Sequence, residues 1–307
     1  MIRVERTPCP RPLDPAFPDE AGPRELRKLT DKVARGETLS GDDFQAYRNA
    51  KVREALREMF HGKCAYCESK IAGSQDTDVE HYRPKKGVTE ADDLGIAHPG
   101  YWWLAMVWEN LVLSCQHCNQ TRSSLVIIPD DLETEEDLRE FLMRQPQSRA
   151  GKLNAFPTED NVWVTAPGNS LGQERPLILN PADVDPEAHL DWVLFKGAAT
   201  VRARDASLAG EATRRILGLN RRWLEEDRRV HLLEMREDRN DIIEAINNWL
   251  TADDAADRDR WSAWADRAIA RLVRRTEPDK PFAGMARAFL AQVQAEVDAM
   301  AQPGGGG

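Results

Sequence analysis

The chain has 307 residues, of which 41 % are hydrophobic, and a formal net charge of −10. This length suffices for one large or two modest domains with a buried core. No segment approaches the ~20 continuous apolar residues that span a bilayer, and the N-terminal segment lacks the apolar core of a signal peptide. We therefore expect a cytoplasmic protein with no membrane partner. The acidic balance argues against a broad nonspecific grip on nucleic acid, but it leaves room for a local basic patch.

Residues 1–62 are predicted to be an N-terminal helical lead-in. The prolines and charges of residues 1–22 suggest a solvated, irregular start, and helical signals follow at about 24–35. Ser40 with Asp43 matches a capping box. Apolar residues at helical spacing then predict one helix that ends near Gly62.

Residues 63–125 are predicted to be a compact metal module. A turn is expected over 73–76, a strand over 79–83, and an extended run over 111–113. The aromatic segment 101–108 favours helical packing over a base-stacking platform. A short helix is expected to begin within 119–124.

Residues 126–205 are predicted to be a mixed extension that packs on this module. It would contain a helix over 133–144, extended pieces at 155–157 and 176–181, and a strand over 192–195 that turns at 196–197. Residues 206–301 carry apolar positions amid dense charge, which predicts long helices over 206–250, 256–275 and 280–301. We expect most of their charge to be solvated and this helical region to bind a partner.

The sequence has five cysteines, and four of them form two CxxC pairs: Cys64 with Cys67 and Cys115 with Cys118. In a reducing compartment, paired CxxC motifs at this spacing indicate a metal site more often than disulfides or redox chemistry. Four thiolates make a closed tetrahedral zinc site. A structural zinc would pin both ends of the intervening segment. Cys9 is left without an assigned function.

The segment between the pairs supplies the groups that a hydrolytic phosphodiesterase needs. His81 is the candidate base, because histidine titrates near neutral pH. Glu80 and Asn119 are the candidate oxygen ligands of a catalytic Mg²⁺ or Mn²⁺. Asn110 is expected to orient His81. Because neighbouring strand residues face opposite ways, Glu80 and His81 must lie at a strand end or bend if both serve one site.

A local basic cluster accompanies this acidic-histidine pair. It consists of Arg83, Lys85, Lys86 and Arg122. Lysine and arginine are the usual phosphate contacts of nucleic-acid-binding proteins, so we expect these residues to bind nucleic acid.

The order CAYC, VEHYRPK, WENL and CQHCN resembles the HNH endonuclease motif. The resemblance implies an α+β, mostly helical protein in which a small ββα-metal finger, braced by structural zinc, is embedded in a larger helical body. It matches the general base to His81 and the central asparagine to Asn110. The last position of the pattern is often histidine and here is Asn119, which makes this chain an H-N-N variant. His117, two residues earlier, is an alternative cation ligand.

Further segments extend the resemblance over roughly residues 60–230. They include LILNPADVDPEAHL and LGLNRRWLEEDRR. This wider pattern is similar to the HNH branch that supplies the nuclease subunit of Septu-type anti-phage systems and of their retron-associated relatives. The resemblance implies an ABC/SMC-like ATPase partner and a nucleic-acid substrate, most often DNA.

Three function classes remain open from the sequence. The first is a metal-dependent endonuclease, and the second is a non-catalytic zinc-finger module that binds nucleic acid or protein. The third is an interaction protein whose function lies in the C-terminal helices. The first and third are compatible, because a nuclease finger can be carried on a partner-binding helical body. The presence of His81 counts against the second class.

Overall fold

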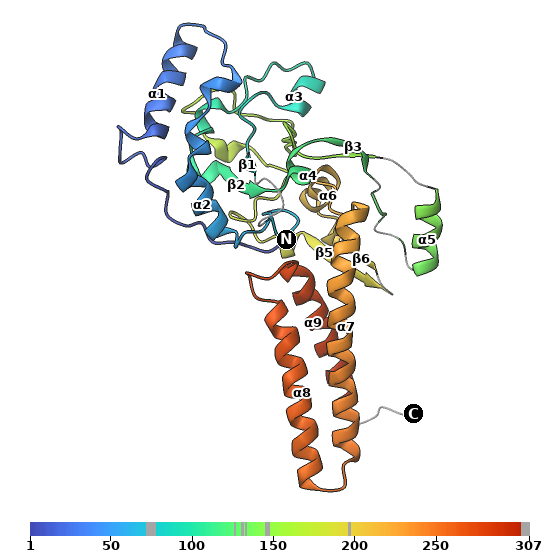
Figure 1. The fold of residues 1–307 in the computed structure, drawn as a ribbon. Helices are drawn as coiled ribbons and strands as arrows, with labels where there is room; N and C mark the ends of the chain where they lie inside the picture. Colours follow the sequence, from blue (N-terminus) through green and yellow to red (C-terminus); the bar gives the residue numbers. More distant parts are fainter. Residues whose placement is uncertain are drawn as a thin grey trace. The chain divides into compact units, whose positions relative to one another are not determined.

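The computed structural model describes residues 1–71, 78–125, 127–129, 132, 134–144, 148–195 and 198–301 (Figure 1). Two compact units divide the chain. The first comprises Met1–Leu125, Gln147–Leu190 and Ala203–Leu219, and the second comprises Val126–Pro146, Asp191–Arg202 and Asn220–Gly307. The segment predicted as a mixed extension is thus shared between the two units.

Helices dominate the described residues, and the sheets are small. The α-helices are α1 (Ala21–Ala34), α2 (Ala50–Met59), α3 (Thr89–Asp93), α4 (Gln116–Asn119), α5 (Glu135–Met143), α6 (Leu208–Ile216), α7 (Arg222–Thr251), α8 (Ala255–Arg275) and α9 (Ala283–Ala301). The strands are β1 (Asp78–His81), β2 (Leu111–Ser114), β3 (Arg122–Leu125), β4 (Ser148–Ala150), β5 (Leu190–Phe195) and β6 (Ala198–Ala203). Short 3-10 helices cover Gly41–Asp43, Ala46–Arg48, Trp102–Leu104, Trp108–Asn110, Leu171–Gln173, Pro186–Ala188 and Arg204–Ala206.

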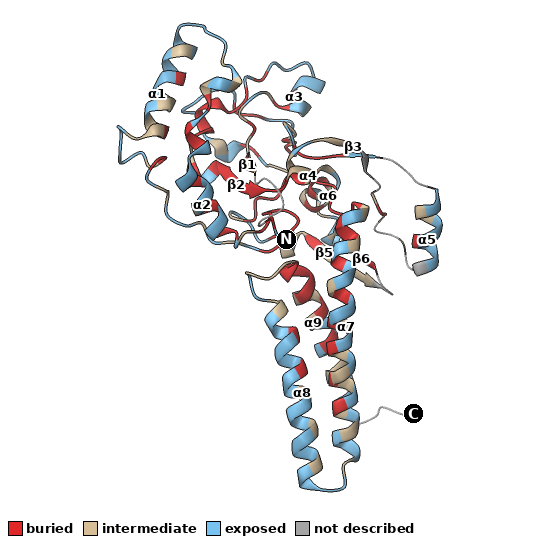
Figure 2. Ribbon diagram, viewed as in Figure 1, coloured by how far each residue is buried: buried red, intermediate tan, exposed pale blue. Residues whose placement is uncertain are grey.

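The first unit is organised around the antiparallel pair of β1 and β2. Glu80 lies opposite Val112 and His81 lies opposite Leu111. All four residues of β2 are buried, so this strand is the centre of the local core and α2 packs against it. Figure 2 shows β2 in the colour of buried residues, whereas in β1 only Glu80 and His81 are buried. The two strands hold the Glu80-His81 pair at the end of β1, which stops two residues before the end expected for a strand over 79–83.

The N-terminal segment is packed into the first unit, and the prediction of a solvated lead-in is wrong. Met1, Ile2 and Leu13 are buried. The Arg6 guanidinium donates hydrogen bonds to the carbonyl oxygens of Trp108, at 3.0 Å, and Leu111, at 2.7 Å. The charged side chain is thus used to satisfy backbone carbonyls at the start of β2, which composition alone does not reveal.

The single helix predicted from Ser40 to Gly62 is also wrong. The Ser40–Asp43 capping box forms, but it caps one 3-10 turn. A second 3-10 turn follows, and the α-helix begins only at Ala50, where the Asn49 side chain accepts a hydrogen bond from the Lys51 amide. A capping pattern marks where a turn starts and does not fix how far it propagates, because helix extension depends on packing.

Other predicted elements shift in detail. The helix expected within 119–124 ends at Asn119, and β3 begins at Arg122. The piece at 176–181 forms one isolated bridge, from Pro176 to Thr158, the residue directly after the piece at 155–157. The aromatic segment 101–108 is buried and contains 3-10 turns, in line with the packing interpretation. The predicted turns at 73–76 and 196–197 lie outside the described residues.

The second unit contains an antiparallel bundle of α7, α8 and α9. The C-terminal prediction of long helices is confirmed, with a break after α6 where Gly218 has a φ of 57°. Asp238 of α7 accepts a hydrogen bond from Arg271 of α8 at 2.6 Å, and Arg239 pairs with Glu296 of α9. Among the described residues, no helix is both long and apolar enough to cross a membrane.

Gly100 sustains a close backbone contact that shapes the first unit. Its φ is 77°, and an added Cβ would lie 2.4 Å from the Lys86 amide nitrogen. Gly100→Ala should therefore destabilise the protein by on the order of 3 kcal/mol, through a left-handed conformation and a backbone clash together. Denaturant unfolding measures this loss.

Gly95→Ala is the matched control for this prediction. Its φ is 72°, but nothing lies within 4 Å of an added Cβ. The control should lose about 1 kcal/mol, from the conformation alone. Equal losses in the two variants would contradict the close contact at Gly100.

Candidate metal centre and active site

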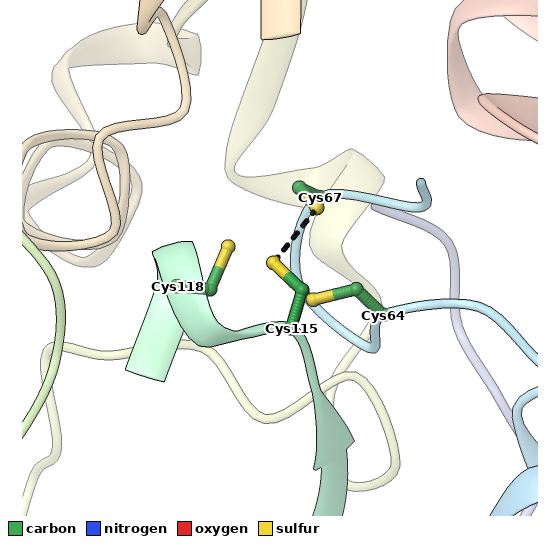
Figure 3. A group of neighbouring side chains, drawn as sticks. All are labelled: Cys64, Cys67, Cys115 and Cys118. Atoms are coloured by element: carbon green, nitrogen blue, oxygen red, sulfur yellow. Dashed lines mark hydrogen bonds between the residues drawn. The ribbon is translucent and has the colours of Figure 1, made fainter. Parts of the chain in front are cut away.

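The four cysteines of the two CxxC pairs converge on one point (Figure 3). All four side chains are buried, and their sulfur atoms lie within 4.8 Å of one another. The Cys67 and Cys115 sulfurs are 3.8 Å apart. A tetrahedral zinc with bonds of about 2.3 Å to sulfur would place its ligands about 3.8 Å apart. The cluster therefore fits a structural metal ion such as zinc.

Local backbone hydrogen bonds hold the two pairs in place. The Cys64 amide donates to the Ser69 carbonyl at 2.9 Å, which closes the first turn. The Ala65 amide donates to the Leu113 carbonyl at 2.8 Å, which ties this turn to β2. Cys115 precedes α4, and Cys118 lies in it. The first pair follows α2 and the second follows β2, so the cluster fastens both sides of the β1–β2 pair.

The thiols of this cluster influence one another strongly. Contact with Cys115 raises the pKa of the Cys118 thiol well above its ordinary value, and Cys64, Cys67 and burial act in the same direction. Four buried thiolates would repel one another without a compensating charge, and a coordinated cation supplies that charge. The donor set and its burial thus agree with metal binding.

An open pocket of about 450 Å³ lies beside this centre, in the first unit. The sequence-predicted residues Glu80, His81, Lys85, Lys86 and Asn119 all line it. Residues that the sequence did not single out complete the lining: Tyr47, Arg48, Arg53, Asp78, Val79, Pro84, Gln120, Leu153 and Asn154.

His81 has an orientation that fixes its tautomer. Its Nε2 lies 3.1 Å from the Ala105 carbonyl oxygen, which can only accept a hydrogen bond, so Nε2 carries the proton. Nδ1 is then the basic nitrogen, and it lies 3.3 Å from Nζ of Lys85. Burial lowers the pKa of His81 well below its ordinary value, and the charge of Lys85 adds to this effect. The imidazole is therefore neutral at neutral pH.

Glu80 is held by a buried lysine. Nζ of Lys152 donates to Oε1 of Glu80 at 2.8 Å and to the His81 carbonyl at 2.9 Å. The Lys152 side chain is fully buried. Burial raises the pKa of Glu80, and the charge of Lys152 opposes that rise. Lys152 was not predicted, because no pattern around it distinguishes it from a surface lysine.

The Lys152 segment is itself attached to the metal centre. The Lys152 amide donates to the Cys118 carbonyl at 2.8 Å, and the Leu153 amide donates to the Asn119 carbonyl at 2.6 Å. Gly151 permits this contact, since a Cβ on it would lie 2.0 Å from the Gln120 carbonyl oxygen. One short segment thus connects the second cysteine pair to the Glu80 carboxylate.

Asn119 meets a carboxylate that the sequence analysis overlooked. Its Nδ2 donates to Oδ2 of Asp78 at 2.9 Å, which leaves its Oδ1 as the available acceptor. Asp78 and Glu80 are two residues apart on β1 and so share one face of the strand. This spacing was the available signal for Asp78. His117, the alternative ligand, is not among the residues that line the pocket.

Asn110 contacts the backbone beyond His81 and not the imidazole. Its Oδ1 accepts from the Arg83 amide at 2.7 Å, and its Nδ2 donates to the Arg83 carbonyl at 3.0 Å. Its own carbonyl accepts from the Tyr82 amide at 2.8 Å. The expected contact with the His81 ring is corrected: Ala105 and Lys85 take the ring nitrogens, and Asn110 fixes where the chain turns after His81.

The predicted basic residues divide into two groups. Lys85 and Lys86 line the pocket, whereas Arg83 pairs with the buried Glu174 at 2.8 Å. Arg122 donates to the Gln116 side chain at 3.1 Å and does not line the pocket. Arg48 and Arg53, both exposed, take their place at the pocket from a part of the sequence far from the motif.

Two curated relatives are similar to this chain. One is the Septu protein PtuB of Bacillus mycoides (strain KBAB4), which is 34 % identical over 232 residues, covering 74 % of this chain and 66 % of the relative. The other is the Septu protein PtuA of the same strain, which is 28 % identical over 184 residues, covering 58 % of this chain and 20 % of the relative. The match thus spans about two thirds of PtuB and a fifth of PtuA. No protein-family profile and no solved structure matches the chain.

Cys115→Ser should remove the bound metal and lower the thermal stability of the first unit, because metal binding is coupled to folding. We expect zinc content to fall from about one equivalent to near zero. Elemental analysis and thermal melting measure the two effects. Cys9→Ser, which changes a cysteine outside the cluster, should keep the metal, and a Cys115→Ser protein with normal zinc would contradict the assignment.

Lys152→Met should destabilise the protein by about 3–5 kcal/mol at neutral pH, because it leaves the Glu80 carboxylate buried without its partner. Burial then raises the folded-state pKa of Glu80 above its unfolded value. The folded state binds the proton more tightly, so the loss is smallest in acid and grows as the pH rises through the folded-state pKa. Denaturant unfolding across pH measures this dependence.

Lys51→Met, at an exposed lysine of α2, is the control for this variant. It should behave as the wild type at every pH. A Lys152→Met protein with a pH-independent loss would show that the lysine contributes packing and no charge compensation.

Proposed function

The chain belongs to the family of Septu PtuB proteins, and we propose that it is the metal-dependent HNH endonuclease subunit of an anti-phage defence complex. The observation that carries this proposal is the orientation of His81. Nε2–H of the neutral His81 imidazole donates to the Ala105 carbonyl, and its basic Nδ1 lies beside Lys85. The pocket around it is lined by basic and acidic side chains. This arrangement suits removal of a proton from water next to a phosphate.

In the proposed reaction, Nδ1 of His81 takes a proton from the attacking water. The Ala105 carbonyl keeps the proton on Nε2, so the lone pair lies on Nδ1, and Lys85, which donates to it here, would turn to the phosphate when substrate binds. Lys85, at 3.3 Å from Nδ1, is placed to bind a phosphate oxygen at the same point. Asn110 keeps the backbone after His81 in position. Arg48 and Arg53 add positive charge at the pocket, which favours binding of a polyanion.

Glu80, Asn119 and Asp78 are the residues that would hold a catalytic Mg²⁺ or Mn²⁺. All three line the same pocket and carry side-chain oxygens, which these cations prefer. Such a cation, when bound, neutralises charge on the phosphate and on the leaving oxygen. Lys152 keeps the Glu80 carboxylate in position in the buried pocket wall. Asp78 and Asn119 hold each other by a hydrogen bond.

Strands β1 and β2 with α4 would form the ββα-metal finger of this activity. The four cysteines would brace it with zinc, and Asn119 would stand at the end of α4 where many HNH proteins have histidine. An amide can replace an imidazole as a ligand through its oxygen, which suits Mg²⁺ better than a soft metal. DNA is the proposed substrate. A non-catalytic zinc-finger module would not need the buried ion pair of Glu80 with Lys152.

A partner subunit of the ATPase class is part of the proposal. The region of PtuA similar to this chain makes up a fifth of that protein, so a chain of this kind also occurs joined to a much larger one. The bundle of the second unit carries exposed apolar side chains that suit an interface. On α7, Trp223, Val230 and Leu233 are 64 %, 58 % and 50 % exposed and share one helix face by their spacing.

His81→Ala should abolish cleavage of plasmid DNA while leaving fold and zinc content unchanged. Removing the base costs at least about 10²-fold in rate. The assay compares both proteins with Mg²⁺ or Mn²⁺, alone and with a candidate partner subunit of the ATPase class. Nicking by His81→Ala at the wild-type rate would contradict the role of His81, and zinc loss in that variant would contradict separate metal sites.

Leu233→Glu should weaken co-purification with the partner, because it places a charge within the exposed apolar face of α7. Met143→Glu is the control, since Met143 is an apolar residue of α5 that is 81 % exposed. Affinity capture of the tagged chain measures the retained partner. A wild-type chain that is fully active as an isolated monomer would contradict the need for a partner.

A further inference from the structure

A second pocket adjoins the candidate active site in the first unit. It is also about 450 Å³, and it shares Lys85 and Lys86 with the pocket that contains His81. The two lysines therefore form a wall common to both pockets. The remaining wall is largely apolar and comes from the end of α1, from the loop that follows it and from residues 99–102: Val33, Leu39, Pro99 and Trp102.

The shared wall is held firmly in place. Gly100 packs against the backbone of the lysine segment so closely that a Cβ on it would lie 2.5 Å from the Gly87 amide nitrogen. The Tyr101 amide also donates to the Pro84 carbonyl at 2.8 Å. Residues 84–87 are thus fixed to the aromatic segment, and both pockets keep their relation to this wall.

We propose that this second pocket binds the base of the nucleotide next to the scissile phosphate. The inference rests on the proposed nuclease function. A phosphate bound by Lys85 lies at His81, because Lys85 is 3.3 Å from the catalytic nitrogen. The nucleotide attached to that phosphate would then reach the second pocket past the two lysines that line both pockets. The pocket combines two features that suit a nucleotide: cationic groups at one side and mainly aliphatic surface at the other, where Trp102 is 5 % exposed.

The pocket also offers polar groups to the edge of a base. Thr38 and Glu37 line it, and the Glu37 carboxylate is paired with Arg35 at 2.5 Å. A hydroxyl and a carboxylate can accept hydrogen bonds from the exocyclic amino group of a base. These contacts would favour amino-bearing bases over thymine. The apolar wall itself is tolerant of sequence.

A base can enter this pocket only if it leaves its stack. In a duplex, that step costs the pairing and stacking energy of the base, whereas an unpaired base costs much less. A protein with this pocket would therefore prefer single-stranded, frayed or locally distorted DNA at the cleavage position. This preference would spare intact duplex.

The test uses His81→Ala protein, so that binding is measured without cleavage, and fluorescently labelled oligonucleotides of one length. One carries adenine bases, a second has the same backbone with abasic residues, and a third is the adenine strand paired in a duplex. We expect the adenine strand to bind on the order of tenfold more tightly than the abasic strand, and more tightly than the duplex.

Leu39→Ser in the same background should reduce the advantage of the adenine strand over the abasic strand to within about twofold. Leu94→Ser, at an exposed leucine outside the pocket, should leave it unchanged. Equal binding of adenine and abasic strands, or equal weakening of both by Leu39→Ser, would overturn the proposal.

The remaining outcomes separate this inference from the proposed function. Cleavage by the wild type without base-dependent binding would overturn the base pocket and leave the nuclease. Absence of binding by every oligonucleotide, together with absence of cleavage by the wild type with its partner, would overturn both. If Leu39→Ser changed only the sedimentation of the protein, the pocket would be a contact between copies of the chain.

Discussion

The convergence of four buried cysteines is the constraint on which the candidate site depends. Cys67 and Cys115 are 48 residues apart in the chain, and their sulfurs are 3.8 Å apart. The first cysteine pair follows α2 and the second follows β2, so a metal at this point joins the two ends of a loop-rich segment. Loop residues alone would be too mobile to keep catalytic groups within the narrow limits that chemistry requires. A metal ion coordinated by the four cysteines would supply that rigidity with few residues.

Hydrogen bonds between neighbouring segments connect the four-cysteine cluster to the Glu80-His81 site. The second cysteine pair carries α4 and Asn119, and the segment at Gly151 pairs with the residues that follow it. Because of these contacts, Nζ of Lys152 lies within hydrogen-bond distance of the Glu80 carboxylate and of the His81 carbonyl. The buried ion pair is costly to form, because both charges leave water. Such a cost is expected where a carboxylate must stay ionised, oriented and close to a base.

The sequence predicted the parts of this site whose chemistry shows in local patterns. Paired CxxC motifs indicate a metal site, because few other structures require cysteines at this spacing. The position of Glu80 and His81 follows from the alternation of side chains along a strand, which places two neighbours in one site only at a strand end or bend. Lys152, Arg48 and Arg53 were beyond reach, since tertiary contacts between distant segments bring them to the pocket. Asn110 was identified, but its predicted contact was wrong, because the sequence does not show whether a side-chain amide will bind a backbone group or an imidazole. The helix expected from Ser40 failed for a related reason: capping is local, whereas helix length is set by packing.

Anomalous X-ray scattering from crystals grown with Mn²⁺, recorded at the zinc and manganese edges, would locate both metals. We expect a zinc peak among Cys64, Cys67, Cys115 and Cys118 and a separate manganese peak between Glu80 and Asn119, beside His81. Two metals in these two places would establish a structural and a catalytic cation with distinct ligands. Manganese at the cysteines, or no manganese in the His81 pocket, would contradict the account.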